Sequence, residues 1–562
     1  MKNLITRVRL NYLGIIFGFF GYCVALTPSL MPRPAIFMGI VAGMSFAVLY
    51  GIGVAASYVV RRHKFISEPS PLTKKRAWIT LASIAPFLII ITSLLARYWQ
   101  NDQRALLDQP PIENTGTLVI VLLATVMFVF LLAIGRGLRW VYKKVQIQVN
   151  KLSFLPSYIG ATAAIILSVV IIVTTLNGVL QRTAIVALDN IYSTKNNSFD
   201  PTFERPSSSL RSGSPDSASS WKGLGREGRR FVASGPTATE ITEFSAKPAK
   251  EPIRAYAGIG NADDRETRVG LVISELERTK AFDRKVLAVV IPTGSGWIEA
   301  ETIAALEYMH NGDTATVAAQ YSSLPSALAL LIDQGDATAM GRELLHAVEN
   351  KLHTMPEASR PKLFVYGLSL GSFGGQSDFT GEDDFARRID AGLFVGTPGF
   401  SEPWRTFTNN RDAGSPQVEP IYQGASTIKF VTDSNDILHD MDAAYKIIYF
   451  QYATDPIVWF DASLIYKQPD WTREEPGRGV SPHLRWFPVV TFLQVAADQL
   501  FSMAMPGSNG HDYSHDTVAP LVAITKPTNW SAAKSLELQH LISTTNLAQG
   551  KSADSRMPTV NN

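Results

Sequence analysis

Five long apolar segments in the first third of the chain limit its possible folds more than any other feature. They are "NYLGIIFGFFGYCVAL", "AIFMGIVAGMSFAVLYGIGVAASYVV", "WITLASIAPFLIIITSLLA", "GTLVIVLLATVMFVFLLAIG" and "YIGATAAIILSVVIIVTTLNGVL". A helix that crosses about 30 Å of hydrocarbon needs roughly 20 apolar residues at about 1.5 Å per residue. Most of the segments reach this length, and a cleaved signal peptide would not be followed by four more of them. We therefore predict an all-α transmembrane domain of five helices over residues 1–180.

The basic residues of the short loops indicate the orientation of these helices. They gather before the first segment, between the second and third, and between the fourth and fifth: Lys2, Arg7, Arg9, Arg61, Arg62, Lys64, Lys74, Lys75, Arg76, Arg136, Arg139, Lys143, Lys144 and Lys151. Because basic loops stay on the cytoplasmic side, we expect a cytoplasmic N-terminus. Five spans then put everything after about residue 180 outside the cytoplasm, whereas a four-span alternative would keep the soluble part inside.

Charge and cysteine content exclude several classes of partner and cofactor. The chain has 52 basic and 49 acidic residues, a net charge of +3, and no basic run interleaved with aromatic residues, which argues against nucleic acid. The one cysteine, Cys23, lies in an apolar run and excludes internal disulfides and thiolate metal clusters. We interpret Cys23 as a small buried apolar side chain.

The remainder of the chain divides into a linker, a folded domain and a tail. Residues 181–250 include "RPSSSLRSGSPDSASS", which we interpret as a linker or mobile loop because its composition offers little surface to bury. From residue 251, short β-branched and aromatic runs such as "VLAVVIP", "KLFVYGL" and "AGLFVGTP" alternate with helical patterns. This alternation predicts an α/β domain over residues 251–527, with a mostly parallel sheet covered by helices on both faces, and a tail over 528–562.

A serine follows one of the predicted strands in "KLFVYGLSLGSFGG", residues 362–375. The apolar run ends at Gly367, and small residues after Ser369 allow a helix to pack closely on the sheet. A sharp turn from strand to helix needs glycine beside the serine and lifts its hydroxyl above the sheet. We predict that Ser369 is the nucleophile of such an elbow; the alternative is a glycine-rich turn with an incidental serine.

Acyl transfer also needs N–H donors for the oxyanion. One candidate is the backbone N–H of Leu370, the residue after the serine. The other comes from the loop in "VLAVVIPTGSGW", where a buried strand precedes Ser295 and Gly296. A loop of small residues with no such role is the alternative.

The acid and the base are expected after the serine, in that order. Asp455 follows the last recognisable strand in "KIIYFQYATDPIVWF", and we favour it over Asp433 and Asp436, which follow the preceding strand. In "PGSNGHDYSHDTVAP" we favour His511 as the base, with His515 as the second candidate. Between acid and base, the segment from Trp471 to Met503 is either a lid or acyl-binding wall, or a core helix.

The assembled motifs resemble a bacterial family of membrane-anchored alpha/beta-hydrolases of poorly defined activity. The matching pieces are "TPSLMPR", "GLGREGRRFV", "IRAYAGI", "PTGSGW", "GLSLGSFGG", "ATDPIVWF" and "GHDY". The resemblance implies a triad of Ser369, Asp455 and His511 and an outward-facing catalytic domain. One departure is Asn509, which stands where the family pattern has a further histidine.

Together these features predict a membrane-anchored serine hydrolase of the esterase or lipase kind. Its expected substrate is an ester of a membrane lipid, a glycolipid or another component of the cell envelope, and its mechanism needs no metal or organic cofactor. An acyltransferase with an alcohol acceptor is the first alternative. The second is a transport or envelope-assembly protein that uses the hydrolase fold as a scaffold. The sequence leaves the natural ester, the acceptor and the oligomeric state open.

Overall fold

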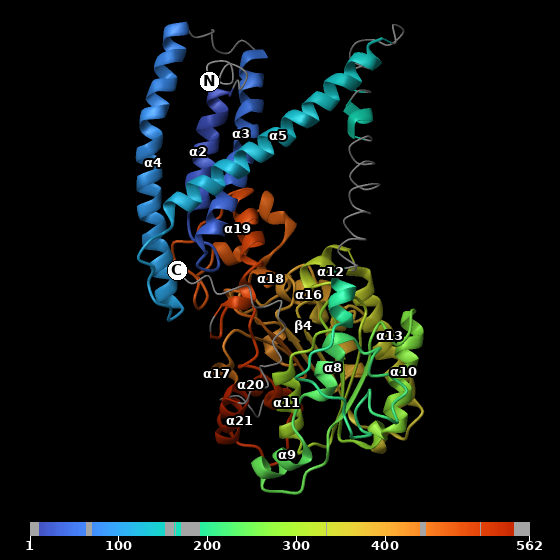
Figure 1. The fold of residues 1–562 in the computed structure, drawn as a ribbon. Coiled ribbons are helices and arrows are strands. Elements are labelled where there is room, and N and C mark those ends of the chain that lie inside the picture. Colours follow the sequence, from blue (N-terminus) through green and yellow to red (C-terminus); the bar gives the residue numbers. More distant parts are fainter. Residues whose placement is uncertain are drawn as a thin grey trace. The chain divides into compact units, whose positions relative to one another are not determined.

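The computed structural model describes residues 10–62, 70–151, 162, 165–169, 191–332, 334–438, 445–505 and 507–544. The chain forms two compact units (Figure 1). Residues 1–187 and 462–500 make up the first, called here the helical unit. Residues 188–461 and 501–562 make up the second, called here the sheet unit.

The helical unit contains the apolar segments. Its helices are α2 (Tyr12–Ala25), α3 (Ala35–Arg62), α4 (Pro71–Leu106) and α5 (Thr117–Val149). In the described residues α3, α4 and α5 are long and apolar enough to cross a membrane, whereas α2 has 14 residues. Most of the fifth predicted span, 158–180, lies outside the described residues. Three of the five predicted spans are thus long enough here, and these helices indicate association with a membrane.

Close packing of α2 on α3 depends on glycines. A Cβ added at Gly53 would lie 2.8 Å from the Cα of Gly14, so the two backbones can approach only because both positions lack side chains. By contrast, large apolar side chains on the outer faces of α4 and α5 are exposed, among them Phe87, Leu94 and Leu118. Exposed apolar rows of this kind are expected on helices that face lipid.

The segment 462–500 is part of the helical unit, although it lies between the candidate acid and the candidate histidine in the sequence. It consists of the 3-10 turns η5 (Ala462–Ile465) and η6 (Asp470–Thr472) and of helix α19 (Val490–Asp498), which packs against α2 and α3 (Figure 1). The predicted continuous domain over 251–527 is therefore interrupted. Contact with α2 and α3 decides this placement, which an apolar helical pattern cannot indicate.

The sheet unit is built on seven parallel strands in the order β1-β3-β2-β4-β5-β7-β6. The strands are short and almost fully buried, which explains their continuous apolar runs. Their bounds are β1 (Ile253–Ala257), β2 (Val286–Ile291), β3 (Thr314–Ala319), β4 (Lys362–Leu368), β5 (Ala391–Val395), β6 (Ile428–Val431) and β7 (Ile447–Phe450). The predicted α/β fold with a parallel sheet is confirmed.

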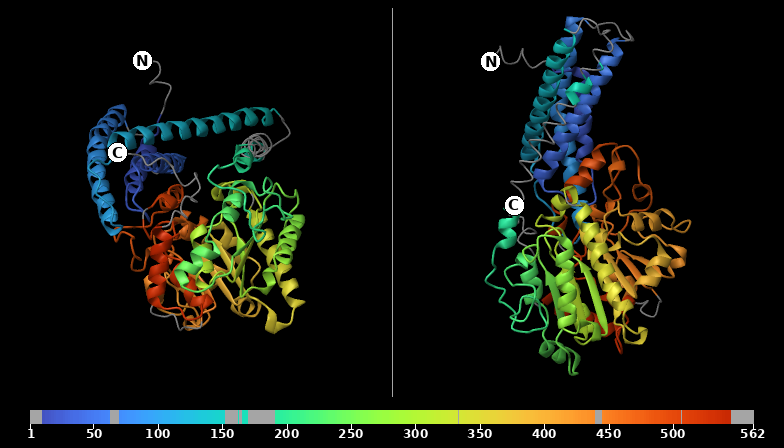
Figure 2. Two further views of the ribbon diagram at one scale, coloured as in Figure 1. Left: turned by 60° about the horizontal axis from the view of Figure 1, so that its bottom comes forward. Right: turned by 90° about the vertical axis from the view of Figure 1, so that its right-hand side faces the viewer.

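Helices cover both faces of this sheet (Figure 2). On one face lie α10 (Arg265–Arg278), α13 (Gln334–His353) and α14 (Leu370–Gln376). On the other lie α8 (Gly225–Ala233), α9 (Ala238–Ser245), α11 (Ala300–Met309), α17 (Ser434–Leu438), α20 (Val518–Thr525) and α21 (Ala532–Thr544). Other helices of the sheet unit are α12 (Ser326–Ile332), α15 (Glu382–Arg388), α16 (Glu402–Asn409) and α18 (Pro456–Trp459).

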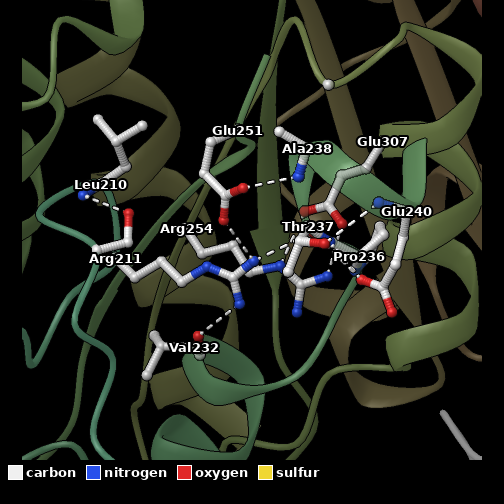
Figure 3. A network of polar contacts seen from close by, with 12 residues as sticks. Leu210, Arg211, Val232, Pro236, Thr237, Ala238, Glu240, Glu251, Arg254 and Glu307 are labelled. Atoms are coloured by element: carbon white, nitrogen blue, oxygen red, sulfur yellow. Dashed lines mark hydrogen bonds and ion pairs between the residues drawn. The ribbon is translucent and has the colours of Figure 1, made fainter. Parts of the chain in front are cut away.

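The serine-rich segment predicted as a linker is instead ordered on the edge of the sheet. Arg211 forms an isolated parallel bridge with Arg254 of β1, and Ser212 N–H donates to the Arg254 carbonyl at 3.0 Å. The Arg211 guanidinium donates to the Val232 carbonyl and to Glu251 (Figure 3). The prediction was wrong here because hydrogen bonds, rather than apolar area, hold the segment.

The predicted tail also belongs in part to the fold. Helix α21 packs against α11 and α20, with Leu538 and Ile542 buried. The sheet unit thus extends through Thr544, beyond the predicted end at residue 527. Residues 545–562 lie outside the described part of the chain.

Candidate active site

Ser369 stands at a sharp turn between β4 and α14. Its φ of 57° and ψ of −122° are strained for a residue with a side chain. Its N–H donates to the Val395 carbonyl at 2.9 Å, which ties the turn to the end of β5. A Cβ added at Gly367 would lie 2.4 Å from the carbonyl carbon of Gly371, so the glycine two positions before the serine allows a close approach within the turn. This backbone has the features of a nucleophile elbow.

Asp455 follows β7, which lies next to β5 in the sheet. Its side chain is fully buried and accepts three hydrogen bonds. The Ile457 N–H donates to Oδ1 at 2.8 Å, while His511 Nδ1 and the Tyr513 hydroxyl each donate to Oδ2 at 2.7 Å. Burial raises the pKa of Tyr513 well above its usual value, so this phenol stays protonated and acts as a donor.

The backbone around His511 is fixed by its neighbours in the sheet unit. The His511 N–H donates to the Ser502 carbonyl at 3.0 Å, and the Gly510 N–H donates to Thr454 Oγ1 at 2.9 Å. The ring lies against Gly396, where an added Cβ would come within 2.6 Å of His511 Cε1. Because Gly396 directly follows Val395, this contact brings the imidazole to the strand end that also holds Ser369.

The structure thus joins two of the three predicted residues directly. Asp455 and His511 are hydrogen-bonded, and Ser369 is connected to their surroundings through β5. Within the described residues, Nε2 of His511 is buried and has no hydrogen-bond partner, so no bond joins it to the Ser369 hydroxyl. Such contacts are often long in unliganded enzymes and shorten when substrate binds.

The rejected candidates lie in different settings. Asp433 follows β6, the edge strand, one strand farther from β4 than Asp455, and its Oδ1 accepts from the Asn435 N–H. In the described part of the chain, Nδ1 of His515 has no hydrogen-bond partner, so no carboxylate orients this ring through Nδ1. The pairing of Asp455 with His511 therefore has a geometric basis that these alternatives lack.

The glycine-rich loop after β2 forms a closed turn. Gly296 has a φ of 87°, and its N–H donates to the Thr293 carbonyl at 2.9 Å. The Tyr256 hydroxyl and Gln320 Nε2 hold the carbonyls of Gly296 and Ser295 at 3.0 and 2.9 Å. Of the two predicted oxyanion donors in this loop, Gly296 is thus already engaged within the turn.

The first turn of α14 lies close to the beginning of this loop. A Cβ added at Gly371 would lie 2.2 Å from the Ile291 carbonyl oxygen and 3.2 Å from that of Pro292. Leu370 is the first residue of α14, and the first N–H groups of a helix have no acceptor within the helix. The Leu370 N–H and the loop that carries Ser295 are therefore at the same edge of the sheet.

Comparison with known families agrees with this geometry. The model of the alpha/beta-hydrolase family matches residues 253–538, half of the chain, and the model of that family's N-terminus matches residues 26–236. The chain belongs to the alpha/beta-hydrolase family. This confirms the predicted resemblance to an alpha/beta-hydrolase family with an N-terminal apolar region. Neither the curated proteins nor the solved structures contain a match to the chain.

Two residues of this alpha/beta-hydrolase were missed by sequence reasoning. Tyr513 is part of the "GHDY" motif, but its bond to Asp455 depends on a fold that brings residues 58 positions apart together. Glu299, next to the start of α11, is buried and accepts hydrogen bonds from Tyr366 at 3.0 Å and from Thr302. Burial, reinforced by Glu301 and Asp512, raises the pKa of Glu299 to about 8. Burial therefore favours the protonated form of this carboxyl group, which follows the glycine-rich loop in the chain.

No cluster of three or more metal-ligating side chains forms within the described residues of the alpha/beta-hydrolase. The polar groups that converge at the carboxyl ends of β2, β4, β5 and β7 are a hydroxyl, an imidazole, a carboxylate and backbone N–H donors. This set is suited to nucleophilic acyl transfer.

Proposed function

We propose that this protein is a membrane-associated serine hydrolase with a triad of Ser369, His511 and Asp455. One observation carries the proposal: Nδ1 of the buried His511 is bonded to Asp455, while Nε2 has no partner within the described residues. A histidine that acts as a general base needs both features. The hydrogen bond at Nδ1 fixes the tautomer of the ring, and Nε2 must remain able to take a proton. The strained turn at Ser369 supplies a nucleophile at the same sheet edge.

The proposed reaction proceeds through an acyl-enzyme. Ser369 Oγ attacks the ester carbonyl carbon while His511 Nε2 takes the hydroxyl proton, and the tetrahedral intermediate collapses as His511 returns that proton to the leaving alkoxide. Water then attacks the acyl-enzyme in the same way, releasing a carboxylic acid and restoring the Ser369 hydroxyl. If an alcohol replaces water in this step, the same residues transfer the acyl group to a new ester.

The oxyanion is proposed to be held by backbone N–H groups. Leu370 would supply one donor, since it follows the nucleophile and begins α14. Ser295 would supply the other, since the N–H of its neighbour Gly296 already donates to Thr293. Two such donors act on charge that develops in the transition state, where each contributes about 3 kcal/mol.

Labelling with a fluorophosphonate probe tests the triad directly. The full-length protein, solubilised in detergent, should be labelled, and Ser369→Ala should abolish the label. Ser377→Ala is the matched control, because Ser377 caps the other end of α14 and should leave labelling unchanged. If folded wild-type protein is not labelled, the hydrolase fold acts as a scaffold and the enzymatic proposal fails.

We propose lipid, glycolipid or other envelope esters as the substrate class, and a catalytic domain outside the cytoplasm. The apolar helices of the N-terminal region support contact with the bilayer, and the basic loops support a cytoplasmic N-terminus. Lipid analysis of cells that contain either the wild type or Ser369→Ala should show an ester that accumulates only with the inactive variant. A difference in free acid would indicate hydrolysis, and a missing ester product would indicate transfer.

A single cysteine at residue 215 tests the orientation. Pro215 is exposed, and Cys23 can be replaced by serine so that Pro215→Cys is the only thiol. A membrane-impermeant maleimide added to intact cells should modify this thiol. Modification only after the membrane is opened would place the domain in the cytoplasm.

A further inference from the structure

The glycine-rich loop, residues 293–297, is held by side chains that the proposed chemistry does not use. Two backbone bonds close the loop: the Gly296 N–H donates to the Thr293 carbonyl and the Thr293 N–H donates to the Trp297 carbonyl, both at 2.9 Å. Because donors and acceptors of these bonds all lie inside the loop, they shape it without attaching it to its surroundings. Two buried side chains from elsewhere in the sheet unit make that attachment.

Tyr256 of β1 holds one carbonyl of the loop. Its hydroxyl donates to the Gly296 carbonyl at 3.0 Å, although β3 separates β1 from β2, the strand that leads into the loop. Burial raises the pKa of Tyr256 well above its usual value, so the phenol stays protonated and remains a donor. The ring packs directly on α8, since a Cβ added at Gly228 would lie 2.3 Å from Tyr256 Cε1. The "GLGREGRRFV" and "IRAYAGI" motifs thus meet at this ring.

Gln320, which directly follows β3, holds the neighbouring carbonyl. It is 1% exposed, and its Nε2 donates to the Ser295 carbonyl at 2.9 Å. The same nitrogen donates to Asn196 Oδ1 at 3.0 Å and to the Ser322 carbonyl at 2.8 Å. The Ile259 N–H donates to Gln320 Oε1 at 3.2 Å. Partners at both ends of the amide therefore keep Gln320 in one orientation.

Gly296 allows both side chains to reach the loop. A Cβ at this position would lie 2.4 Å from the Tyr256 hydroxyl oxygen and 2.9 Å from Gln320 Cγ. The peptide between Ser295 and Gly296 is bonded at both of its polar groups, the carbonyl to Gln320 and the N–H to Thr293. Within the described residues, the N–H of Ser295 itself donates to no protein acceptor. The loop thus fixes the peptide that follows this N–H and leaves the N–H available.

We propose that Tyr256 and Gln320 are positioning residues of the oxyanion site, which hold the glycine-rich loop so that the Ser295 N–H stays within reach of the developing oxyanion. This rests on the proposed function, in which Ser295 is one oxyanion donor. Neither side chain touches a reacting atom. The loop begins directly after residues 291 and 292, whose carbonyls contact the first turn of α14, so its position is set relative to Ser369.

The geometry of an oxyanion donor explains why the loop needs such support. A donor stabilises the transition state only when its N–H lies about 3 Å from the oxyanion, and a displacement of about 1 Å can lower a rate about 100-fold. A loop of glycine and other small residues samples many backbone conformations and offers little side-chain surface to pack. Buried donors at two successive carbonyls remove that freedom.

The test compares full-length variants in detergent with the wild type. p-Nitrophenyl butyrate is the ester probe, and its kcat and KM are measured beside the rate of fluorophosphonate labelling. Tyr256→Phe keeps the buried ring and removes only the hydroxyl. It should lower kcat about 10-fold and leave KM within about twofold, because the oxyanion contact forms only in the transition state. Labelling should slow by a similar factor, since phosphonylation also places an oxygen in the oxyanion site.

Gln320→Leu removes the amide and should lower kcat about 30-fold. The double variant should lose no more than the roughly 100- to 1,000-fold expected when one oxyanion donor is removed, because both side chains act through the same N–H. Hydrogen–deuterium exchange of the backbone at residues 293–297 should be faster in each variant. Exchange reports on the loop independently of catalysis.

Tyr449→Phe is the matched control. Tyr449 is also a fully buried tyrosine of a strand, and its hydroxyl donates to Gln376 Oε1 at 2.9 Å. This variant should leave kcat, labelling and exchange at 293–297 within about twofold of the wild type. All rates are compared at a temperature at which every variant is folded. Tyr256→Phe keeps the test possible if Gln320→Leu does not fold.

The outcomes separate the two proposals. Wild-type kcat, labelling and loop exchange in folded Tyr256→Phe and Gln320→Leu would overturn the positioning role, as would an equal loss in Tyr449→Phe. A raised KM with unchanged kcat would also contradict it, because the two residues would then act on substrate binding. If the wild type is labelled but does not hydrolyse this ester, the labelling rates decide. If the wild type is not labelled at all, the proposed function fails, and the positioning role fails with it.

Discussion

Each unit of the protein contains a fully buried pair of arginine and carboxylate, and the two pairs differ in geometry. In the sheet unit, Arg254 Nε and Nη2 each donate to one oxygen of Glu307 at 2.8 Å (Figure 3). Arg254 Nη1 donates to the Phe231 carbonyl at 2.6 Å. In the helical unit, Arg33 and Asp498 are 3.5 Å apart without a hydrogen bond between those atoms. Arg33 instead donates to backbone carbonyls, and Ser29 donates to Asp498.

The two pairs therefore differ in how well their buried charges compensate each other. The two parallel bonds between Arg254 and Glu307 compensate both charges and connect β1 to α11. At the Arg33–Asp498 pair, each charge has partners of its own, and the carboxylate remains costly to ionise, since burial raises the pKa of Asp498 to about 6. We expect the first pair to contribute more to the free energy of unfolding than the second.

The largest expected effect comes from breaking the tighter pair. Glu307→Gln leaves the charge of Arg254 buried without compensation, so the free energy of unfolding of the sheet unit should fall by about 3–5 kcal/mol. Denaturant titration followed by tryptophan fluorescence measures this. Glu343→Gln, which removes a partly exposed partner of Arg265, is the control and should cost below about 1 kcal/mol. Equal losses in the two variants would contradict the assignment.

The looser pair should show a smaller loss of stability. Asp498→Asn keeps an oxygen that can accept from Ser29, and Arg33 keeps its bonds to the carbonyls of Ala25 and Thr27. We expect a decrease of about 1–3 kcal/mol in the free energy of unfolding. The comparison between the pairs fails if this variant is as unstable as Glu307→Gln in the same titration.

Glu299 is a buried carboxyl group whose hydrogen bonds come from Thr302 and Tyr366 rather than from an arginine, and its effect on stability should depend on pH. The pKa of Glu299 is raised from 4.5 to about 8 in the folded state, so between these values the folded protein keeps a proton that the unfolded chain releases. The contribution of Glu299 to stability is therefore present below about pH 4.5 and is lost as pH rises toward 8. Glu299→Gln should melt at a higher temperature than the wild type at pH 9, with a smaller difference near pH 5. Parallel melting curves at both pH values would contradict this.

We expect the smallest effect on stability at Asp455, whose carboxylate is held by hydrogen bonds from groups other than arginine. Asp455 accepts from Ile457, His511 and Tyr513. Tyr513→Phe removes one of these three bonds, worth about 1–2 kcal/mol, and should lower the fluorophosphonate labelling rate by about 5- to 30-fold. Tyr449→Phe, which removes the hydrogen bond of another buried tyrosine to Gln376, is the matched control. If Tyr449→Phe lowers the rate equally, the loss reflects packing and not the support of Asp455.

Sequence patterns predicted those features that depend on local chemistry. A strand followed by a serine with glycine two positions away on either side predicted the turn at Ser369, because such a turn allows few residue types. Chain order pointed to Asp455 and His511, which the structure brings into contact. The apolar helices were predicted by their length, although α2 is shorter than a span and most of the fifth lies outside the described residues.

Long-range contacts account for the features that the sequence did not predict. The serine-rich segment around Arg211 looked unable to fold, yet its hydrogen bonds to β1 and Glu251 order it. The sequence predicted the Gly296 N–H as an oxyanion donor, but in the structure this N–H donates a hydrogen bond to the Thr293 carbonyl. In both places the structure depends on a hydrogen-bond partner whose position cannot be predicted from a sequence pattern.

The sequence by itself determined the class of the fold, the apolar helices and the chemical types available for a triad, because these follow from periodicity and from the few residues that a sharp turn accepts. Only the tertiary structure decided that segment 462–500 packs with the N-terminal helices, that Arg33 meets Asp498, and that Tyr513 supports Asp455. The physical reason is that polar groups are buried and paired through contacts between residues far apart in the chain. Local sequence preferences do not predict these contacts.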